Sequence, residues 1–281
     1  MANIGLALGG GGAKGIAHVI VIEAIEELGL KPVSITGTSI GAIVGVLYAG
    51  GANSQDIRDI FLQFSLDRNQ SIKDLVTKRH IFKWMDFIGP QFRGKGLIRV
   101  ENLLNFLFES IQSTTFEELK IPLRVVAADF WTREEHILDS GLLLPAVRGS
   151  MSLPGLLEPV KLNGSLLIDG GAVNPVPFDR LHAHCDFSIA VDVLGIKSSS
   201  AKTPSLSDAV FNTFQIMQKS IIREKLITHR PNLYLVPSLQ DVRMLEFYRA
   251  REILDAARKQ KNHFKKMIDQ AIEDQLKEKK I

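Results

Sequence analysis

The stretch that decides the fold is Val33-Ser34-Ile35-Thr36-Gly37-Thr38-Ser39-Ile40-Gly41. Its first four residues are typical of a β-strand and helix formers follow its end, so Ser39 lies at a strand-to-helix turn. Such a tight turn holds a serine hydroxyl clear of the backbone, and the flanking glycines Gly37 and Gly41 avoid a steric clash. We therefore predict that Ser39 is a nucleophile.

A second glycine turn precedes this one. Residues 4–8 predict a short buried strand, residues 9–15 (Gly-Gly-Gly-Gly-Ala-Lys-Gly) a loop, and apolar residues at helical spacing from Ile16 to Leu28 a helix. The first 50 residues thus contain two βα units, whose right-handed crossover requires neighbouring parallel strands. Both turns then lie at the carboxyl ends of those strands, where open α/β sheets bind ligands.

Strand and helix patterns continue to alternate along the chain, which predicts an α/β fold with a mainly parallel sheet. The dipeptide Asn163-Gly164 predicts a tight hairpin, because its turn needs positive φ angles. Asp169-Gly170-Gly171 follows the second strand of this hairpin, so a carboxylate is displayed at a turn. Further strands are expected at 123–129, 136–138, 187–193 and 233–236, and helices at 54–64, 101–111, 142–151, 207–228 and 244–281.

Composition limits the class of protein. A chain of 281 residues, 45% of them hydrophobic, can form one domain over 1–281, and its formal charge of +3 is too small to indicate nucleic-acid binding. The single cysteine, Cys185, excludes an intrachain disulfide framework. The amino terminus has no signal-peptide pattern, and the longest apolar helix candidate, 40–49, is far short of the roughly 20 residues that span a bilayer. We expect a soluble cytoplasmic protein.

Residues 65–100 have poor periodicity and several glycines, and we expect a lid or a variable insertion there. Between Lys73 and Arg99, seven basic residues stand against two acidic ones, among aromatic and apolar side chains. Basic and apolar groups together favour contact with an anionic membrane surface. An ordinary surface helix and loop with one side facing the core explains the same pattern, and both interpretations remain open.

Ester hydrolysis by a serine requires a base and donors for the oxyanion. The glycine loop supplies the donors, because consecutive backbone N–H groups lie before a helix N-terminus. None of the seven histidines has a local catalytic signature, whereas Asp169 is displayed by the two small residues that follow it. An aspartate of pKa about 3.9 is a weak base, but desolvation raises that value. We predict a Ser39–Asp169 dyad.

At this point the chain resembles a known family over about residues 4–193. Three of its motifs, in this order and spacing, are similar to those of the patatin-like phospholipases: Gly10-Gly11-Gly12-Ala13-Lys14-Gly15, Gly37-Thr38-Ser39-Ile40-Gly41 and Asp169-Gly170-Gly171. Other stretches agree with the family pattern, namely residues 15–18, 150–154, 158–160 and 174–177. The resemblance implies a three-layer α/β/α fold with a mainly parallel central sheet. It also implies hydrolysis of phospholipids, lysophospholipids or related acyl esters through an acyl-serine, with no metal or cofactor.

The resemblance assigns a role to each motif residue. Ser39 is the nucleophile and Asp169 is the proton acceptor. Lys14 matches a basic position of the family, where it either supports the loop or is solvated. The oxyanion hole is formed by Gly10, Gly11 and Gly12, and the motifs are shaped by Gly15, Gly37, Gly41, Gly170 and Gly171.

Three alternatives remain. Gly10-x-Gly12-x-x-Gly15 also satisfies the dinucleotide-binding pattern, although the second strand runs into Ser39 without the carboxylate that binds a ribose. An α/β-hydrolase triad would use Ser39, Asp169 and then His182 or His184. A lipid-binding or regulatory module would keep the fold without turnover.

Overall fold

The computed structural model describes residues 3–63, 65, 104–105, 108, 111–195, 206–239 and 241–278. Apart from residue 65, the predicted lid or insertion at 65–100 lies outside these residues. The same holds for most of the predicted helix at 101–111.

Within the described residues the strands form one eight-stranded sheet in the order β5-β6-β3-β2-β1-β7-β8, with β4 also paired to β3. The pairs β3·β2, β2·β1, β1·β7 and β7·β8 are parallel, and β4, β5 and β6 pair antiparallel, so the predicted mainly parallel sheet is confirmed. The parallel strands are β1 (Ile4–Leu8), β2 (Pro32–Thr38), β3 (Leu123–Asp129), β7 (Phe187–Val191) and β8 (Leu233–Leu235). The antiparallel strands are β4 (Glu135–Leu138), β5 (Val160–Leu162) and β6 (Ser165–Asp169).

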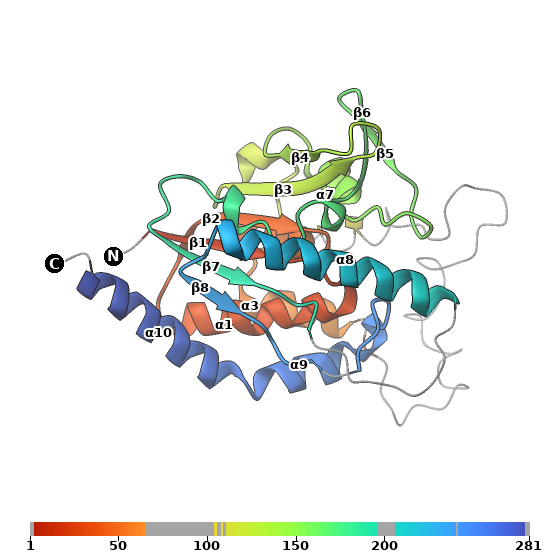
Figure 1. Cartoon of the computed structure of the whole chain (residues 1–281). Helices are drawn as coiled ribbons and strands as arrows, with labels where there is room; N and C mark the ends of the chain where they lie inside the picture. Colours follow the sequence, from red (N-terminus) through yellow and green to blue (C-terminus); the bar gives the residue numbers. More distant parts are fainter. Residues whose placement is uncertain are drawn as a thin grey trace.

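Helices cover both faces of this sheet (Figure 1). They are α1 (His18–Glu27), α2 (Ile40–Gly50), α3 (Ser54–Leu62), α7 (Leu143–Ser150), α8 (Leu206–Thr228), α9 (Ala250–Arg258) and α10 (Lys261–Glu278). Short 3₁₀ turns occur at Gly12–Ala17, Phe116–Glu118, Gly170–Ala172, Phe178–Arg180 and Phe247–Arg249.

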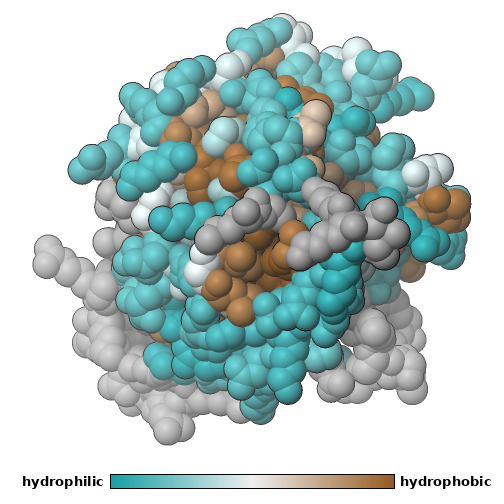
Figure 2. All heavy atoms as spheres, turned by 90° about the vertical axis from the view of Figure 1, so that its left-hand side faces the viewer, coloured by the Kyte–Doolittle hydropathy of each residue, from teal (hydrophilic) through white to brown (hydrophobic). Residues whose placement is uncertain are grey.

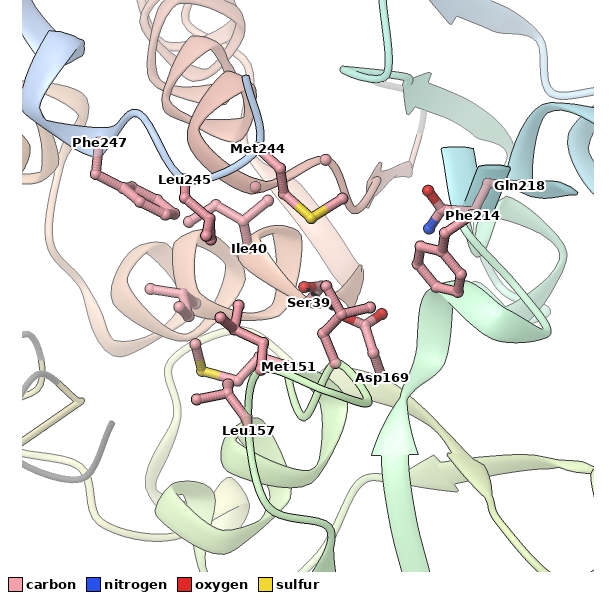
Figure 3. Close-up of a pocket in the computed structure, with 15 residues that line it drawn as sticks. Ser39, Ile40, Met151, Leu157, Asp169, Phe214, Gln218, Met244, Leu245 and Phe247 are labelled. Carbon is pink, nitrogen blue, oxygen red and sulfur yellow. Dashed lines mark hydrogen bonds between the residues drawn. The ribbon is translucent and has the colours of Figure 1, made fainter. Parts of the chain in front are cut away.

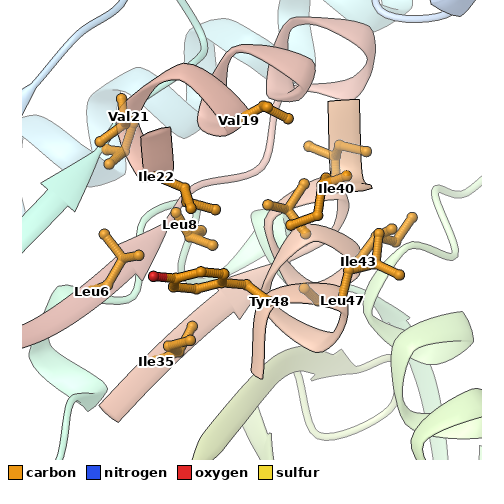
Figure 4. Close-up of a cluster of buried hydrophobic side chains, with 14 of the residues drawn as sticks. Leu6, Leu8, Val19, Val21, Ile22, Ile35, Ile40, Ile43, Leu47 and Tyr48 are labelled. Atoms are coloured by element: carbon orange, nitrogen blue, oxygen red, sulfur yellow. The ribbon is translucent and has the colours of Figure 1, made fainter. Parts of the chain in front are cut away.

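The central strand β1 shows how the layers are built, because its successive side chains point to opposite faces. Leu6 and Leu8 belong to a large buried cluster with residues of α1 and α2, as Figure 4 shows. Ala7 points the other way and belongs to a smaller cluster that includes Ile222 of α8. Two hydrophobic layers on opposite sides of one sheet confirm the expected three-layer α/β/α fold.

Local structure agrees with several predictions and corrects others. The hairpin at Asn163-Gly164 is confirmed, with φ angles of 50° and 86°. Strand β7 ends at Val191 rather than at residue 193, because the Asp192 carboxylate accepts the N–H of Leu194 and turns the chain. The helix after the glycine loop starts as a 3₁₀ turn at residue 12, and the helical segment expected at 244–281 is interrupted between α9 and α10.

The face that Figure 2 shows is mostly hydrophilic, and its hydrophobic side chains gather in a hollow near the centre and in smaller groups above and beside it. In the part of the chain that the structure describes, no helix has the length and apolar character that a membrane crossing requires.

Candidate active site

The pairing of β1 with β2 places the two glycine turns side by side. The strands are parallel and Leu8 pairs with Gly37, so both turns begin at the same edge of the sheet. The approach is so close that a Cβ atom on Gly41 would lie 2.1 Å from the carbonyl oxygen of Leu8. Only glycine fits at this position, which explains why the motif around the nucleophile ends in one.

Ser39 joins β2 to α2 with φ 55° and ψ −121°. A positive φ is unusual for a residue with a side chain, and such strained residues concentrate at functional turns. The hydroxyl oxygen of Ser150 accepts the backbone N–H of Ser39 at 2.9 Å and donates to the carbonyl of Val126 at 2.6 Å. The strained turn is therefore anchored to β3.

The side chain of Ser39 contacts Asp169 directly (Figure 3). Its Oγ donates a hydrogen bond of 2.8 Å to Oδ2 of Asp169, while Oδ1 accepts the backbone N–H of Gly171 at 2.7 Å. Asp169 ends β6, where the antiparallel pairing with β3 sets it opposite Ala127. The predicted nucleophile and the predicted proton acceptor, 130 residues apart in the sequence, thus form one hydrogen-bonded pair.

Burial changes the acid-base behaviour of Asp169. The side chain is 5% exposed, and desolvation raises its pKa from 3.8 to about 6. The N–H of Gly171 and the hydroxyl of Ser39 partly oppose this rise, since both stabilise the charged carboxylate. Asp169 is therefore a stronger base than an exposed aspartate and is still mainly ionised at neutral pH.

Two of the three glycines predicted to form the oxyanion hole line the pocket of this pair. Gly11 and Gly12 line the same pocket as Ser39 and Asp169, and within the described residues no acceptor binds their N–H groups. The N–H of Gly10 instead donates to the carbonyl of Pro175 at 2.9 Å. The N–H of Gly10 is therefore not free to bind an oxyanion, and Gly11 and Gly12 stay the predicted donors.

Two buried side chains hold the glycine loop in place. Lys14 is 4% exposed and its ammonium donates to the carbonyl of Leu194 at 2.6 Å, so the alternative of a solvated lysine is wrong. His18 is fully buried and its Nε2 donates to the carbonyl of Gly9 at 2.8 Å. Burial lowers the pKa of His18 to about 4, so the imidazole is neutral at neutral pH.

The remaining motif glycines lie where other groups approach the backbone closely. A Cβ atom at any of these positions would lie within 2.6 Å of a neighbouring residue. The neighbour is Ile40 for Gly15, Gly41 for Gly37, Val126 for Gly170 and Gln218 for Gly171. Gly15 lets the glycine loop pack on the Ser39 turn, and Gly171 also donates its N–H to Oδ1 of Asp169.

The pocket in front of the Ser39–Asp169 pair has mostly apolar walls, contributed by α2, the segment after α7, α8 and the segment before α9 (Figure 3). The apolar lining residues are Ile40, Ile43, Met151, Leu153, Leu156, Leu157, Phe214, Met244, Leu245 and Phe247. An apolar wall beside an activated serine suits the acyl chain of an ester.

Two polar residues of the site carry no sequence signal that assigns them a role. Ser150 lies in a stretch that fits the family pattern, but only the structure shows its hydroxyl under the Ser39 turn. Gln218 lies outside every motif and reaches the pocket from the middle of α8.

The histidines of the triad alternative lie elsewhere. His182 and His184 stack on each other, with ring centroids 5.3 Å apart. The backbone N–H of His182 donates to Oγ of Ser34, near the amino end of β2, whereas Ser39 follows its carboxyl end. The triad alternative is therefore wrong, because Asp169 already contacts Ser39 with no imidazole between them.

The other strand-end acids hold turns. Asp129 accepts the N–H groups of Trp131 and Thr132, and Asp192 accepts the hydroxyl of Tyr234 besides the N–H of Leu194.

The glycine loop is unsuited to the pyrophosphate of a dinucleotide, because two of its N–H groups donate to the carbonyls of Pro175 and Met244.

Comparisons with known proteins agree with this geometry. An uncharacterised NTE family protein of Mycobacterium bovis is 32% identical over 201 residues, which are 71% of this chain and 51% of that protein. Lysophospholipase NTE1 of Saccharomyces cerevisiae is 35% identical over 216 residues, 76% of this chain and 12% of that protein. The chain thus spans about half of the mycobacterial relative and a small part of the yeast one.

The fold is also similar to that of a solved structure. The crystal structure of VipD from Legionella pneumophila aligns with a TM-score of 0.51 at 14% identity, covering 94% of this chain and 66% of that one. The sequence model described as patatin-like phospholipase matches residues 6–182, which include all three motifs. The chain belongs to the patatin-like phospholipase family.

Proposed function

We propose that this chain forms one catalytic domain that hydrolyses carboxylic ester bonds of phospholipids, lysophospholipids or related acyl esters. The observation that carries the proposal is the 2.8 Å hydrogen bond from Ser39 Oγ to Asp169 Oδ2 at the end of an apolar pocket. The printed name of the yeast relative, a lysophospholipase, supports this substrate class.

In the acylation step Asp169 takes the proton of Ser39 while Oγ attacks the ester carbonyl. The N–H groups of Gly11 and Gly12 stabilise the oxyanion, and the N-terminus of α2, whose first turn has no acidic residue, adds positive potential at Ser39. Protonated Asp169 then gives its proton to the leaving alcohol, and the acyl group remains on Ser39. Each oxyanion donor contributes about 10²-fold to 10³-fold in turnover.

In the deacylation step water attacks the acyl-serine. Asp169 again accepts a proton, now from the water, and returns it to Ser39 as the free fatty acid leaves. Because the same carboxylate serves both steps, no histidine is needed.

The surroundings of the site fit an enzyme that works on aggregated lipid. The pocket is apolar, and Leu245 in its wall is 39% exposed. We include in the proposal a peripheral contact with a membrane surface and, because Cys185 is the sole cysteine, a cytoplasmic location.

Labelling with a fluorophosphonate probe tests the nucleophile. Wild type should be labelled covalently at Ser39, Ser39→Ala should not be labelled, and Asp169→Asn should react at least about 10²-fold more slowly because its base is lost. Release of fatty acid from lysophosphatidylcholine and phosphatidylcholine vesicles then tests the substrate class. An unlabelled wild type, or labelling that persists in Ser39→Ala, would overturn the proposal.

A further inference from the structure

We propose that Gln218 is a positioning residue that binds the water molecule that hydrolyses acyl-Ser39. The inference rests on the proposed function, since it concerns the second half of that reaction. Gln218 lies on α8, beyond the residues 6–182 that match the family model.

The side chain of Gln218 is buried with its amide oxygen unpaired. It is 3% exposed, and its Oε1 has no hydrogen-bond partner among the described residues. A buried amide oxygen without a partner is destabilising, and native proteins usually satisfy such atoms with protein groups or water. Gln218 also lines the pocket that contains Ser39 and Asp169, so a partner can reach it from the active site.

The carboxamide of Gln218 lies beside the turn that carries the catalytic carboxylate. The position that a Cβ atom of Gly171 would take is 2.1 Å from Nε2 of Gln218 and 2.9 Å from Oδ1 of Asp169. These two atoms are therefore at most about 5 Å apart, so the carboxamide that carries the unpaired Oε1 lies next to the catalytic carboxylate. Figure 3 shows both side chains directed toward the same part of the pocket.

The chemistry of deacylation requires an acceptor at this place. A water molecule has two protons, of which Asp169 takes one while the oxygen lone pair attacks the acyl carbonyl. The second proton stays on the oxygen as the new bond forms, and Oε1 of Gln218 accepts its hydrogen bond. An amide oxygen orients the water without competing for the proton, because it is not a base at neutral pH.

The scaffold holds Gln218 in place. Two turns further along α8, the ammonium of Lys225 donates to the carbonyl of Val176 at 2.9 Å and pairs with Asp179. Between them Ile222 is buried against the second face of the sheet. The helix therefore presents Gln218 from a fixed backbone, as a positioning role requires.

The test compares wild type with Gln218→Met, which keeps the length of the side chain and removes the amide. With p-nitrophenyl butyrate in stopped flow, the acylation burst should stay within about threefold of wild type, while steady-state kcat falls 10-fold or more. Intact-protein mass spectrometry during steady state should show a larger fraction of butyryl adduct on Ser39 in the variant than in wild type. Hydroxylamine, a nucleophile stronger than water, should restore turnover in the variant.

Ile222→Ala is the matched control on the same helix, outside the pocket. It should lower the melting temperature and leave the fraction of acyl-enzyme the same as in wild type. If Gln218→Met turns over like wild type, or if its burst rate and kcat fall together, the inference is overturned. If Gln218→Met does not fold, Gln218→Leu is measured in the same way. The proposed function is tested separately, since its failure would leave wild type without a burst and without fluorophosphonate labelling.

Discussion

The backbone N–H of Ser39 donates to Oγ of Ser150 at 2.9 Å, and this bond ties the nucleophile turn to the end of α7. Ser150 is fully buried, and its own proton is donated to the carbonyl of Val126. One hydroxyl thus satisfies two backbone groups of the site and fixes the strained serine relative to β3.

Ser150→Ala should lower both activity and stability, because it leaves two buried backbone groups unpaired. We expect a free energy of unfolding about 1–3 kcal/mol lower. We also expect kcat to fall about 10-fold with little change in KM, because the acyl pocket is intact. Ser152→Ala is the control: that hydroxyl is equally buried but donates to the carbonyl of Arg148 at 2.7 Å. It should lose stability and keep kcat, and equal kcat losses in both variants would contradict the role of Ser150.

The pH profile should report Asp169. The base must be ionised to accept a proton, and its pKa is raised to about 6 by burial. Activity, measured as kcat/KM on a soluble ester, should be constant near neutral pH and fall tenfold per pH unit below about 6. A profile that stays flat down to pH 4 would show that a carboxylate with an ordinary pKa is the base.

The stability of the fold should depend on His18 in acid. Its pKa is lowered from 6.5 to about 4 in the folded protein, so the unfolded chain binds a proton more readily. The contribution of His18 to the free energy of unfolding is complete above pH 6.5 and is lost as the pH falls toward 4. At pH 4.5 this loss amounts to about 2–3 kcal/mol. The contribution of Asp169 to stability changes with pH in the opposite direction, because its pKa is raised in the folded protein. The test therefore compares the loss of stability on acidification in wild type with the same loss in a variant without His18.

Urea denaturation of wild type and His18→Gln at pH 7 and pH 4.5 measures that difference. The variant should lose less stability between the two pH values than wild type does. An equal loss in both proteins would mean that His18 does not carry this pH dependence.

Gly41→Ala should be strongly destabilising, since the new Cβ atom would meet the carbonyl oxygen of Leu8 at 2.1 Å. Neither the Cβ atom nor the carbonyl oxygen can rotate away, because both are fixed by the backbone. The clash can be relieved only by a shift of β1 against α2, which should lower the free energy of unfolding by about 3 kcal/mol or more. Gly45→Ala in the same helix is the control, because its nearest neighbour is the end of the Leu123 side chain at 3.1 Å. Differential scanning fluorimetry should show a large drop in melting temperature for Gly41→Ala. For Gly45→Ala the change in melting temperature should be small, equivalent to less than about 1 kcal/mol.

Much of this arrangement is predictable from local sequence, and the reasons are physical. Two βα units in succession require parallel neighbours, so the adjacency of the glycine loop and Ser39 follows from chain connectivity. The pairing of Ser39 with Asp169 is predictable because a hairpin signal sets the acid at a strand end.

Other features depend on long-range packing that no local pattern encodes. The N–H of Gly10 cannot join an oxyanion hole, because it donates to the carbonyl of Pro175 on a distant loop. The amide of Gln218 enters the site because α8 crosses the second face of the sheet, and a lone glutamine in an amphipathic helix gives no sign of this. The same limit applies to the histidines, whose distance from Ser39 is decided by which end of β2 they approach.

The segment before α9 closes the site from far along the chain. The carbonyl of Met244 accepts the N–H of Ala13 at 2.8 Å and lies so close to Gly12 that no side chain fits between them. During synthesis, the nucleophile and the oxyanion loop therefore emerge from the ribosome long before the residues that cover them. A nascent chain that has passed Asp169 carries the serine, the carboxylate and the glycine loop but still lacks the two pocket walls contributed by α8 and by the segment before α9, so the enzyme is expected to become active only late in translation.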